Sequence, residues 1–255
     1  MSQKSDLVTP WIVRPRPNPG AALRLVCFSY GGGGASAFRN WPVALPGDVE
    51  ILAIELPGRE TRSREPRFDR LDPLVTALTD AVAPRIDRPF AIYGHSLGSL
   101  VGFGFARELR RRGLPGPCHL FMSGRRAPQL PERSALATLP DGELLAALRR
   151  MGGIPDVVFA EPDLIAWYLP IIRTDIAISE LEVIADDAPL DCPITAFGGL
   201  TDELATPAEI AAWRSQTSAA FDHELFTGGH FFLQTARDAF LGSLSRRLSR
   251  ITTSR

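Results

Sequence analysis

Short apolar runs alternate along the chain with longer segments whose apolar residues recur every three to four positions. The short runs predict buried strands at 24–30, 50–56, 89–93, 118–123, 193–197 and 223–226. Helical spacing is found at 36–44, 71–86, 99–112 and 236–251. Strands that alternate with helices are typical of a mostly parallel sheet flanked by helices. The pattern therefore predicts an α/β fold, with a single domain over residues 1–255.

This alternation is interrupted at 127–188, where we find helical spacing without a convincing strand. Asp141 is a suitable N-cap for one of the helices there. Two extra crossover helices are one interpretation, but the stretch is several times longer than a crossover requires. We therefore expect a helical lid insertion at 127–188 that covers the functional site. Residues 1–20 are polar and proline-rich, and we expect them to form an arm.

A serine stands between a predicted strand and a predicted helix, in the sequence Gly94-His95-Ser96-Leu97-Gly98. In that context Gly-x-Ser-x-Gly is the nucleophile elbow of α/β-hydrolases. The serine needs a strained backbone at the end of the strand, and side chains at 94 and 98 would clash with the turn. An ordinary turn is the alternative, and the flanking strand and helix favour a nucleophile at Ser96.

A serine hydroxyl needs a base that takes its proton, and the base needs an orienting acid. Hydrolases of this fold have the chain order Ser, acid, His. His230 follows the last predicted strand, so we expect it to be the base. Asp202 lies on the loop after the 193–197 strand and is the expected acid. The alternatives are Glu203, Asp175 and Asp187.

Acyl transfer also requires two donors for the developing oxyanion. One is expected to be the backbone N–H of Leu97, directly after the nucleophile. The glycines at 31–34 follow the first predicted strand and allow a backbone amide to approach the substrate closely. We expect the second donor at Gly31, with Tyr30 as the alternative. A phosphate-binding loop is disfavoured, because no Gly-Lys-Ser/Thr follows the glycines.

Composition limits the remaining possibilities. The chain has 255 residues, 45% hydrophobic content and a net charge of −1, so nothing favours nucleic acid or an anionic membrane as partner. Cys27, Cys118 and Cys192 are widely spaced, and we expect free thiols and no metal site. We find neither a signal peptide nor an apolar stretch long enough to span a membrane. We therefore expect a cytoplasmic protein.

Four segments together resemble the type II thioesterases of polyketide and nonribosomal peptide assembly lines. The segment 25–33 is similar to the family's LxCFPHAGG opening, and 56–62 matches its LPGRexR segment. The segment 229–233 matches GGHFFL, and 172–175 resembles an arginine–aspartate element of the family's lid. The chain departs from the family at Ser29-Tyr30, usually Pro-His, and at Leu97-Gly98-Ser99, often Met-Gly-Ala.

The resemblance implies an α/β-hydrolase fold and hydrolytic editing in antibiotic biosynthesis. The substrates would be stalled or wrong acyl groups on the phosphopantetheine thiol of acyl or peptidyl carrier proteins. No cofactor is implied, since phosphopantetheine belongs to the substrate, and we expect a monomer. Two other functions remain open, a carboxylesterase or lipase of the same fold and a non-catalytic binding protein.

Two groups of residues are candidates for substrate binding besides Tyr30. Arg59 follows a strand end and could shape the mouth of the site, or form a surface ion-pair cluster with Glu60 and Arg62. The aromatic residues of the predicted lid could line an acyl chamber or belong to the core. They are Phe159, Trp167 and Tyr168. Within the lid, Asp175 is expected to be a salt-bridge partner rather than the catalytic acid.

Overall fold

The computed structural model describes residues 9–131, 133, 135–154, 156–181 and 188–253. Within these residues the chain forms a seven-stranded sheet in the order β1-β3-β2-β4-β5-β6-β7. The first strand is antiparallel to its neighbour and all other pairs are parallel. The strands are β1 (Ile12–Val13), β2 (Leu23–Phe28), β3 (Val49–Ile54), β4 (Phe90–His95), β5 (Leu120–Ser123), β6 (Ile194–Gly199) and β7 (Phe221–Phe226).

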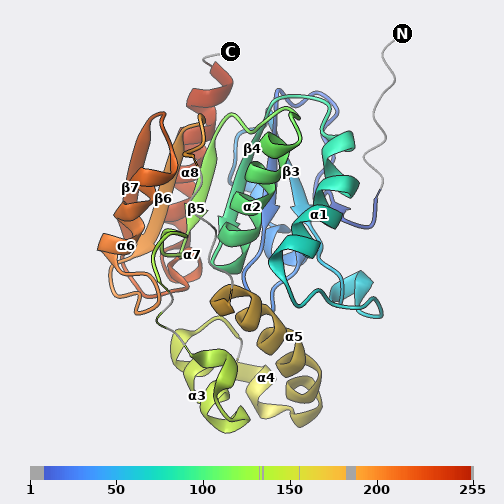
Figure 1. Ribbon diagram of the computed structural model, residues 1–255, viewed down its shortest axis with the longest axis vertical. Helices are drawn as coiled ribbons and strands as arrows, with labels where there is room; N and C mark the ends of the chain where they lie inside the picture. Colours follow the sequence, from blue (N-terminus) through green and yellow to red (C-terminus); the bar gives the residue numbers. More distant parts are fainter. Residues whose placement is uncertain (1–8, 132, 134, 155, 182–187, 254–255) are drawn as a thin grey trace.

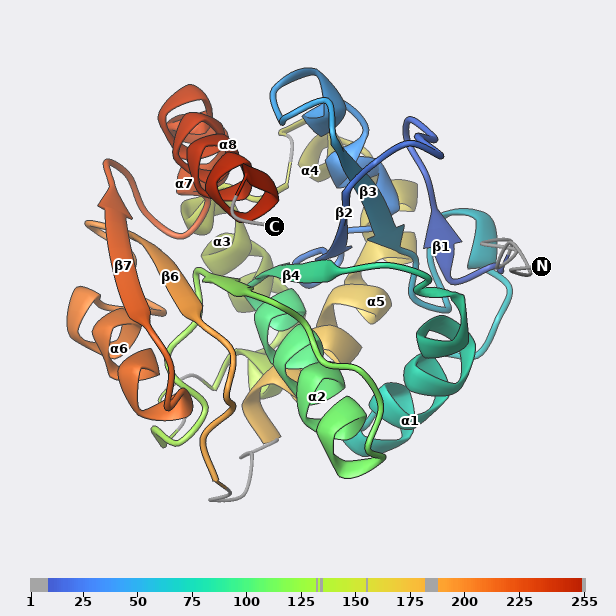
Figure 2. The same cartoon turned by 90° about the horizontal axis from the view of Figure 1, so that it is seen from above.

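Helices cover both faces of the sheet, so the molecule has three layers (Figure 2). The α-helices are α1 (Leu71–Val82), α2 (Leu97–Arg111), α3 (Asp141–Met151), α4 (Asp156–Ala160), α5 (Pro162–Leu181), α6 (Pro207–Ala211), α7 (Phe232–Thr235) and α8 (Arg237–Thr253). One face is covered by α1, α2 and α6, and the other by α7 and α8. This arrangement confirms the predicted α/β-hydrolase fold.

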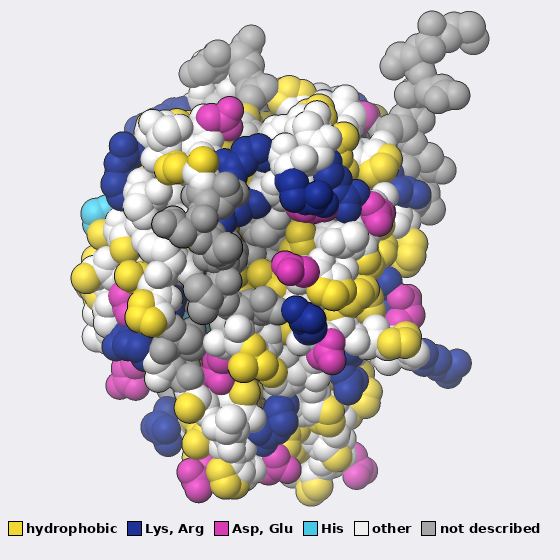
Figure 3. All heavy atoms as spheres, in the orientation of Figure 1, with side chains coloured by type: hydrophobic (Ala, Val, Ile, Leu, Met, Phe, Trp, Pro, Cys, Tyr) yellow, Lys and Arg dark blue, Asp and Glu magenta, His cyan; other side chains and the backbone are white. Residues whose placement is uncertain are grey.

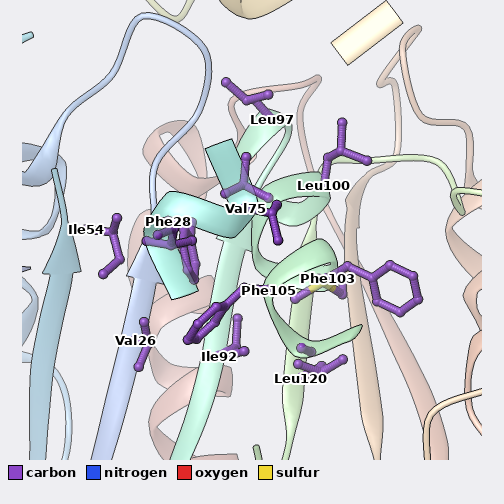
Figure 4. Close-up of a cluster of buried hydrophobic side chains, with 14 of the residues drawn as sticks. Val26, Phe28, Ile54, Val75, Ile92, Leu97, Leu100, Phe103, Phe105 and Leu120 are labelled. Carbon is purple, nitrogen blue, oxygen red and sulfur yellow. The ribbon is translucent and has the colours of Figure 1, made fainter. Parts of the chain in front are cut away.

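The strands of the sheet interior are buried along their whole length, from β2 to β6. Their apolar side chains point into both layers, as a parallel sheet with helices on both faces requires. On the α2 side, the ring of Phe28 packs against that of Phe105 of the helix, and Ile92 lies beside them (Figure 4). This core fixes where β4 ends and α2 begins, and so it fixes the turn that carries Ser96.

The helices α3, α4 and α5 lie together beyond the carboxyl ends of the strands (Figure 1). They share a small apolar cluster centred on Leu144, Leu148 and Ile172. The carboxyl-terminal half of α5 also joins the main core through Ile178 and contacts α2. We call residues 127–188 the insertion, of which 132, 134, 155 and 182–187 lie outside the described residues.

Two features of the surface bear on the expected partners. Basic and acidic side chains are interspersed on the face that Figure 3 shows, in keeping with the net charge of −1. In the described parts of the chain, no helix is both long and apolar enough to cross a membrane.

The predicted amino-terminal arm is wrong at residues 11–13. Trp11 and Ile12 are buried, and Ile12 pairs with Ile54 as an antiparallel edge strand. The predicted helix at 36–44 is replaced by two 3₁₀ turns, Ala35–Phe38 and Trp41–Val43. A proline within the first turn of the second piece removes a backbone donor, which disfavours one continuous helix.

Candidate active site

Ser96 lies between the last residue of β4 and the first residue of α2 in a conformation that non-glycine residues rarely adopt. Its φ is +54° and its ψ is −117°. The turn is so tight that a β-carbon at Gly94 would stand 2.2 Å from the carbonyl oxygen of Gly98. Such backbone strain costs about 1–3 kcal/mol and persists only where the surroundings hold it. Here the backbone N–H of Ser96 donates to the carbonyl of Ser123 on β5, at 2.8 Å.

Ser99 binds this turn to the neighbouring strand. Its hydroxyl lies 2.8 Å from the carbonyl oxygen of Gly94 and 2.9 Å from that of Ser123, and it accepts the N–H of Ser123 at 2.9 Å. The side chain is fully buried. The family that this chain resembles often has alanine at this position. Serine at position 99 therefore adds hydrogen bonds on the buried side of the elbow, and the side of Ser96 that faces the pocket is unchanged.

His230 and Asp202 form a buried pair at the carboxyl end of the sheet. Nδ1 of His230 lies 2.9 Å from Oδ2 of Asp202. The other carboxylate oxygen, Oδ1, accepts the N–H groups of Leu204 at 2.9 Å and Ala205 at 3.3 Å. With the carboxylate fixed in this way, Nδ1 of the imidazole carries the proton and Nε2 is left as a base.

The alternative acids do not contact His230 in the described structure. Glu203 is exposed, and the carboxylate of Asp175 is bound to Arg59. Asp187 lies outside the described residues.

His95 forms part of the floor beneath His230, with 5.2 Å between the ring centroids. Nδ1 of His95 lies 2.9 Å from the hydroxyl oxygen of Ser123. Burial, and next the charge of His230, hold the pKa of His95 well below its usual value. His95 is therefore neutral at physiological pH and serves as an uncharged packing surface for His230.

The glycine loop, residues 31–34, leads from β2 past Ser96. The N–H of Gly33 donates to the carbonyl of Tyr30 at 2.9 Å, and that of Gly32 donates to Oδ2 of Asp175 at 2.7 Å. Gly32 has a φ of +76°, which favours glycine. Among the described residues, none accepts a hydrogen bond from the N–H of Gly31. Gly31 lines the same pocket as Ser96, so its amide is available to a ligand there.

The pocket in front of Ser96, which we call the serine pocket, has a volume of about 100 Å³. Its apolar wall comes mainly from the insertion, which supplies Leu136, Leu148, Met151, Ile172 and Ile176; Leu204 and Phe231 complete it. Polar groups at its edge are Arg125, Arg126, Ser179 and Glu180. A small, largely apolar pocket beside a hydroxyl and an imidazole suits the acyl part of an ester or thioester.

A second pocket of about 270 Å³, the loop pocket, is lined by all four residues of the glycine loop. It shares Tyr30, Gly31 and Ile172 with the serine pocket and is further lined by Trp167 and Tyr168. Trp167 is 45% exposed, so the core interpretation is wrong for this residue. Phe159 and Tyr168 pack against the apolar cluster of the insertion.

A larger cleft of about 770 Å³ lies near Phe90 and Cys118, at the amino ends of β4 and β5. Ser96 lies at the opposite edge of the sheet, at the carboxyl ends of the strands. This cleft is therefore not the active site, although it is larger.

The surface interpretation of the 59–62 segment is wrong. Arg59 and Arg62 are 4% and 5% exposed. Arg62 donates to the carbonyl of Glu55 and to Glu65, and it stacks over Trp11. Glu60 accepts from the backbone and hydroxyl of Ser36.

Arg59 makes a bidentate ion pair with Asp175, with both N–O distances 2.8 Å. Its Nη1 also donates to the carbonyl of Gly33 at 3.0 Å. These two terminal nitrogens are therefore engaged inside the protein, although Arg59 lines the loop pocket.

The sequence analysis missed several residues of the serine pocket. Arg125 donates to the backbone and hydroxyl of Ser179 on α5 and lies just beyond the carboxyl end of β5. Ligands bind at that edge of α/β sheets, so its position after a predicted strand was a usable signal. Ile172 and Ile176 are four residues apart on α5 and share one face of it. Apolar residues occur all around this helix, so its sequence does not indicate which face contacts the site.

Comparisons with known proteins agree with this geometry. The Thioesterase domain family matches residues 23–248. The gramicidin S biosynthesis protein GrsT of Aneurinibacillus migulanus is 38% identical over 242 residues, which cover 94% of each chain. The structure of the thioesterase RedJ, from the prodiginine pathway of Streptomyces coelicolor, is 40% identical with a TM-score of 0.84 over 91% of each chain. That of the type II thioesterase BorB, from the borrelidin cluster, is 33% identical with a TM-score of 0.81, over 97% of this chain and 98% of BorB. The chain therefore belongs to the thioesterase family, and within it to the type II thioesterases of polyketide and nonribosomal peptide pathways.

Proposed function

We propose that this protein hydrolyses aberrant or stalled acyl groups from the phosphopantetheine thiol of acyl or peptidyl carrier proteins. The observation that carries this proposal is the buried Asp202–His230 pair, whose imidazole lines one pocket together with the strained Ser96. The names of its relatives, which belong to gramicidin, prodiginine and borrelidin biosynthesis, support carrier-bound substrates.

In the proposed mechanism, Oγ of Ser96 attacks the thioester carbonyl while Nε2 of His230 takes its proton. The backbone amides of Leu97 and Gly31 stabilise the negative oxygen of the tetrahedral intermediate. His230 then protonates the departing pantetheine sulfur, and an acyl-serine ester remains. Water attacks this ester with His230 as base, which releases the carboxylic acid and restores Ser96. Asp202 holds the imidazole and stabilises its protonated form.

We assign the acyl group to the serine pocket and the pantetheine arm to the loop pocket. The two pockets meet at Tyr30 and Gly31, next to the reacting carbonyl. A volume of about 100 Å³ corresponds to about three water-sized groups, so the pocket as described takes a short acyl chain. Trp167, half-exposed at the loop pocket, offers an apolar surface to the arm.

We further propose that the insertion at 127–188 is a lid on the single domain of residues 1–255. It supplies most of the apolar wall of the serine pocket, so its displacement would open the pocket to longer acyl groups. The enzyme would act as a monomer alongside its carrier proteins, and we place it in the cytoplasm with them.

The deciding experiment presents the enzyme with carrier proteins loaded with acetyl, butyryl or hexanoyl groups. Free pantetheine thioesters and oxygen esters with the same acyl groups serve as comparisons. We expect kcat/KM to be highest on the loaded carriers and lowest on the oxygen esters. A preference for oxygen esters would instead identify a carboxylesterase, and binding of acyl carriers without turnover would identify a non-catalytic protein.

A further inference from the structure

One carboxylate of the insertion is bound to the glycine loop that follows β2. Asp175 belongs to α5, yet its Oδ2 accepts both the N–H of Gly32 and Nη1 of Arg59, at 2.7 and 2.8 Å. Its Oδ1 accepts Nη2 of Arg59 at 2.8 Å. The same Arg59 donates to the carbonyl of Gly33. The ion pair thus holds the loop at two successive residues, the N–H of Gly32 through Asp175 and the carbonyl of Gly33 through Arg59.

These contacts determine the direction of the N–H of Gly31. This N–H shares a planar, trans peptide group with the carbonyl of Tyr30, so the two point in opposite directions. The Tyr30 carbonyl accepts the N–H of Gly33 at 2.9 Å, and Gly33 is in turn held by Arg59. The loop therefore has little freedom to rotate the Gly31 amide while the ion pair is in place.

The loop also rests directly on the face of α5 that carries Asp175. A β-carbon at Gly31 would stand 3.4 Å from Cβ of Asp175, and one at Gly32 would stand 2.7 Å from Cγ1 of Ile172. Ile172 and Asp175 are three residues apart and share one face of the helix. The other expected oxyanion donor, the N–H of Leu97, is fixed differently, by the first turn of α2.

We propose that Arg59 and Asp175 are positioning residues that orient the Gly31 amide as an oxyanion donor and make this donor depend on the docking of α5. The inference rests on the proposed function, in which Gly31 acts on the thioester oxygen. When α5 is docked, both donors face the reacting carbonyl. When α5 moves away, the Gly32 amide loses its acceptor and the loop loses its packing surface. Hydrolysis is thereby confined to the closed state.

The test compares variants of the full-length enzyme on an acetyl-loaded carrier. Asp175→Asn removes the charge but keeps the shape of the side chain. Asp141→Asn is the matched control, because it breaks the pair between Arg173 and Asp141 within the same insertion and leaves the glycine loop untouched. We expect Asp175→Asn to lower kcat about 10- to 100-fold with KM within about twofold, as for loss of an interaction made in the transition state. The control is expected to stay within twofold of wild type.

A double variant, Arg59→Met with Asp175→Leu, separates positioning from folding. Replacing a buried ion pair by apolar residues often preserves stability. We expect this variant to melt close to wild type and still to be at least about tenfold slower, because nothing accepts the Gly32 amide. Recovery of wild-type kcat in the double variant would show that the pair only holds the fold, and would overturn the proposal. So would Asp175→Asn with kcat within twofold of wild type.

A second readout does not depend on the natural substrate. When a fluorophosphonate phosphonylates Ser96, Oγ displaces fluoride and negative charge develops on the phosphoryl oxygen, which occupies the same hole in the transition state. The rate constant of labelling should therefore fall in Asp175→Asn and in the double variant but not in Asp141→Asn. If wild type is labelled rapidly but releases no acyl group from carriers, the proposed function fails while the labelling series still decides the role of the pair. Equal labelling rates in all variants would overturn that role.

Discussion

Gly98 lies so close to Phe28 that a β-carbon at position 98 would stand 2.2 Å from the Phe28 carbonyl oxygen. Gly98 belongs to the first turn of α2, and Phe28 is the last residue of β2, separated from the glycine loop only by Ser29 and Tyr30. This contact sets the distance between the turn that carries Ser96 and the loop that carries Gly31. The second glycine of the elbow is therefore required by a neighbouring strand as well as by the turn itself.

Gly98→Ala is expected to lower activity at least about 100-fold, because the β-carbon pushes the Leu97 amide away from the glycine loop. Gly142→Ala is the matched control, since a β-carbon there has no atom within 4 Å and α3 gains a better helix former. We expect the control to keep full activity. Rates on an acetyl thioester and melting temperatures check both variants, and an active Gly98→Ala enzyme would contradict the account of the elbow.

Ser96→Ala should abolish turnover and leave the melting temperature close to that of wild type. Loss of a triad nucleophile costs many orders of magnitude in kcat. Ser99→Ala removes a hydroxyl three positions away that only braces the turn, so we expect less than about a tenfold loss in rate and a stability loss of about 1 kcal/mol or more. If Ser96→Ala kept a tenth of the wild-type rate, another residue would have to be the nucleophile.

Asp202→Asn and Glu203→Gln make the same chemical change at adjacent positions. We expect the first to lower kcat about 10⁴-fold, because an amide favours the wrong tautomer of His230. The second alters an exposed side chain and should leave kcat within about twofold. Steady-state rates on one thioester are sufficient, and the reverse result would show that Glu203 is the acid.

Amide hydrogen exchange rates should differ between the two halves of α5, on either side of Pro170. The carboxyl-terminal half contains the buried residues of this helix and is bound to the main domain through Asp175 and Ser179. The helix α4 contains no buried residue. We therefore expect amides at 157–160 and 166–169 to exchange much faster than those at 172–180. Uniformly slow exchange across the insertion would exclude a lid that opens through its outer helices.

Stability should decrease as the pH falls from about 6.5 to 4. Burial lowers the pKa of His119 to about 4, and its ring stacks on Phe121 while Nε2 lies 2.9 Å from the Thr195 hydroxyl. Between these pH values the unfolded chain binds a proton that the folded chain excludes, so the free energy of unfolding drops by about 1–3 kcal/mol.

His119→Gln should make the dependence of stability on pH shallower, and His223→Gln, at an exposed position, is the comparison variant. Part of the slope is expected to remain, because burial also lowers the pKa of His95. Urea unfolding at pH 7 and pH 5 measures the effect. An identical slope in His119→Gln and wild type would show that other groups account for the acid sensitivity.

The sequence by itself determined the parts of this protein whose physical requirements are local. A strained serine between a strand and a helix needs small residues at fixed spacing, so the sequence alone predicted the elbow at 94–98. The order of strands also placed Asp202 and His230 on successive loops at one edge of the sheet, and the structure brings them within 2.9 Å of each other.

Only the tertiary structure decided which residues surround that site. β1 has two residues, too few for a pattern, and exists because Ile12 and Val13 pair with β3. Arg59 and Asp175 are 116 positions apart, and each alone looks like a surface charge. The helix α5 is apolar on several sides, so its sequence does not say which side meets Ser96. Burial and ion pairing between distant segments depend on packing that no local pattern encodes.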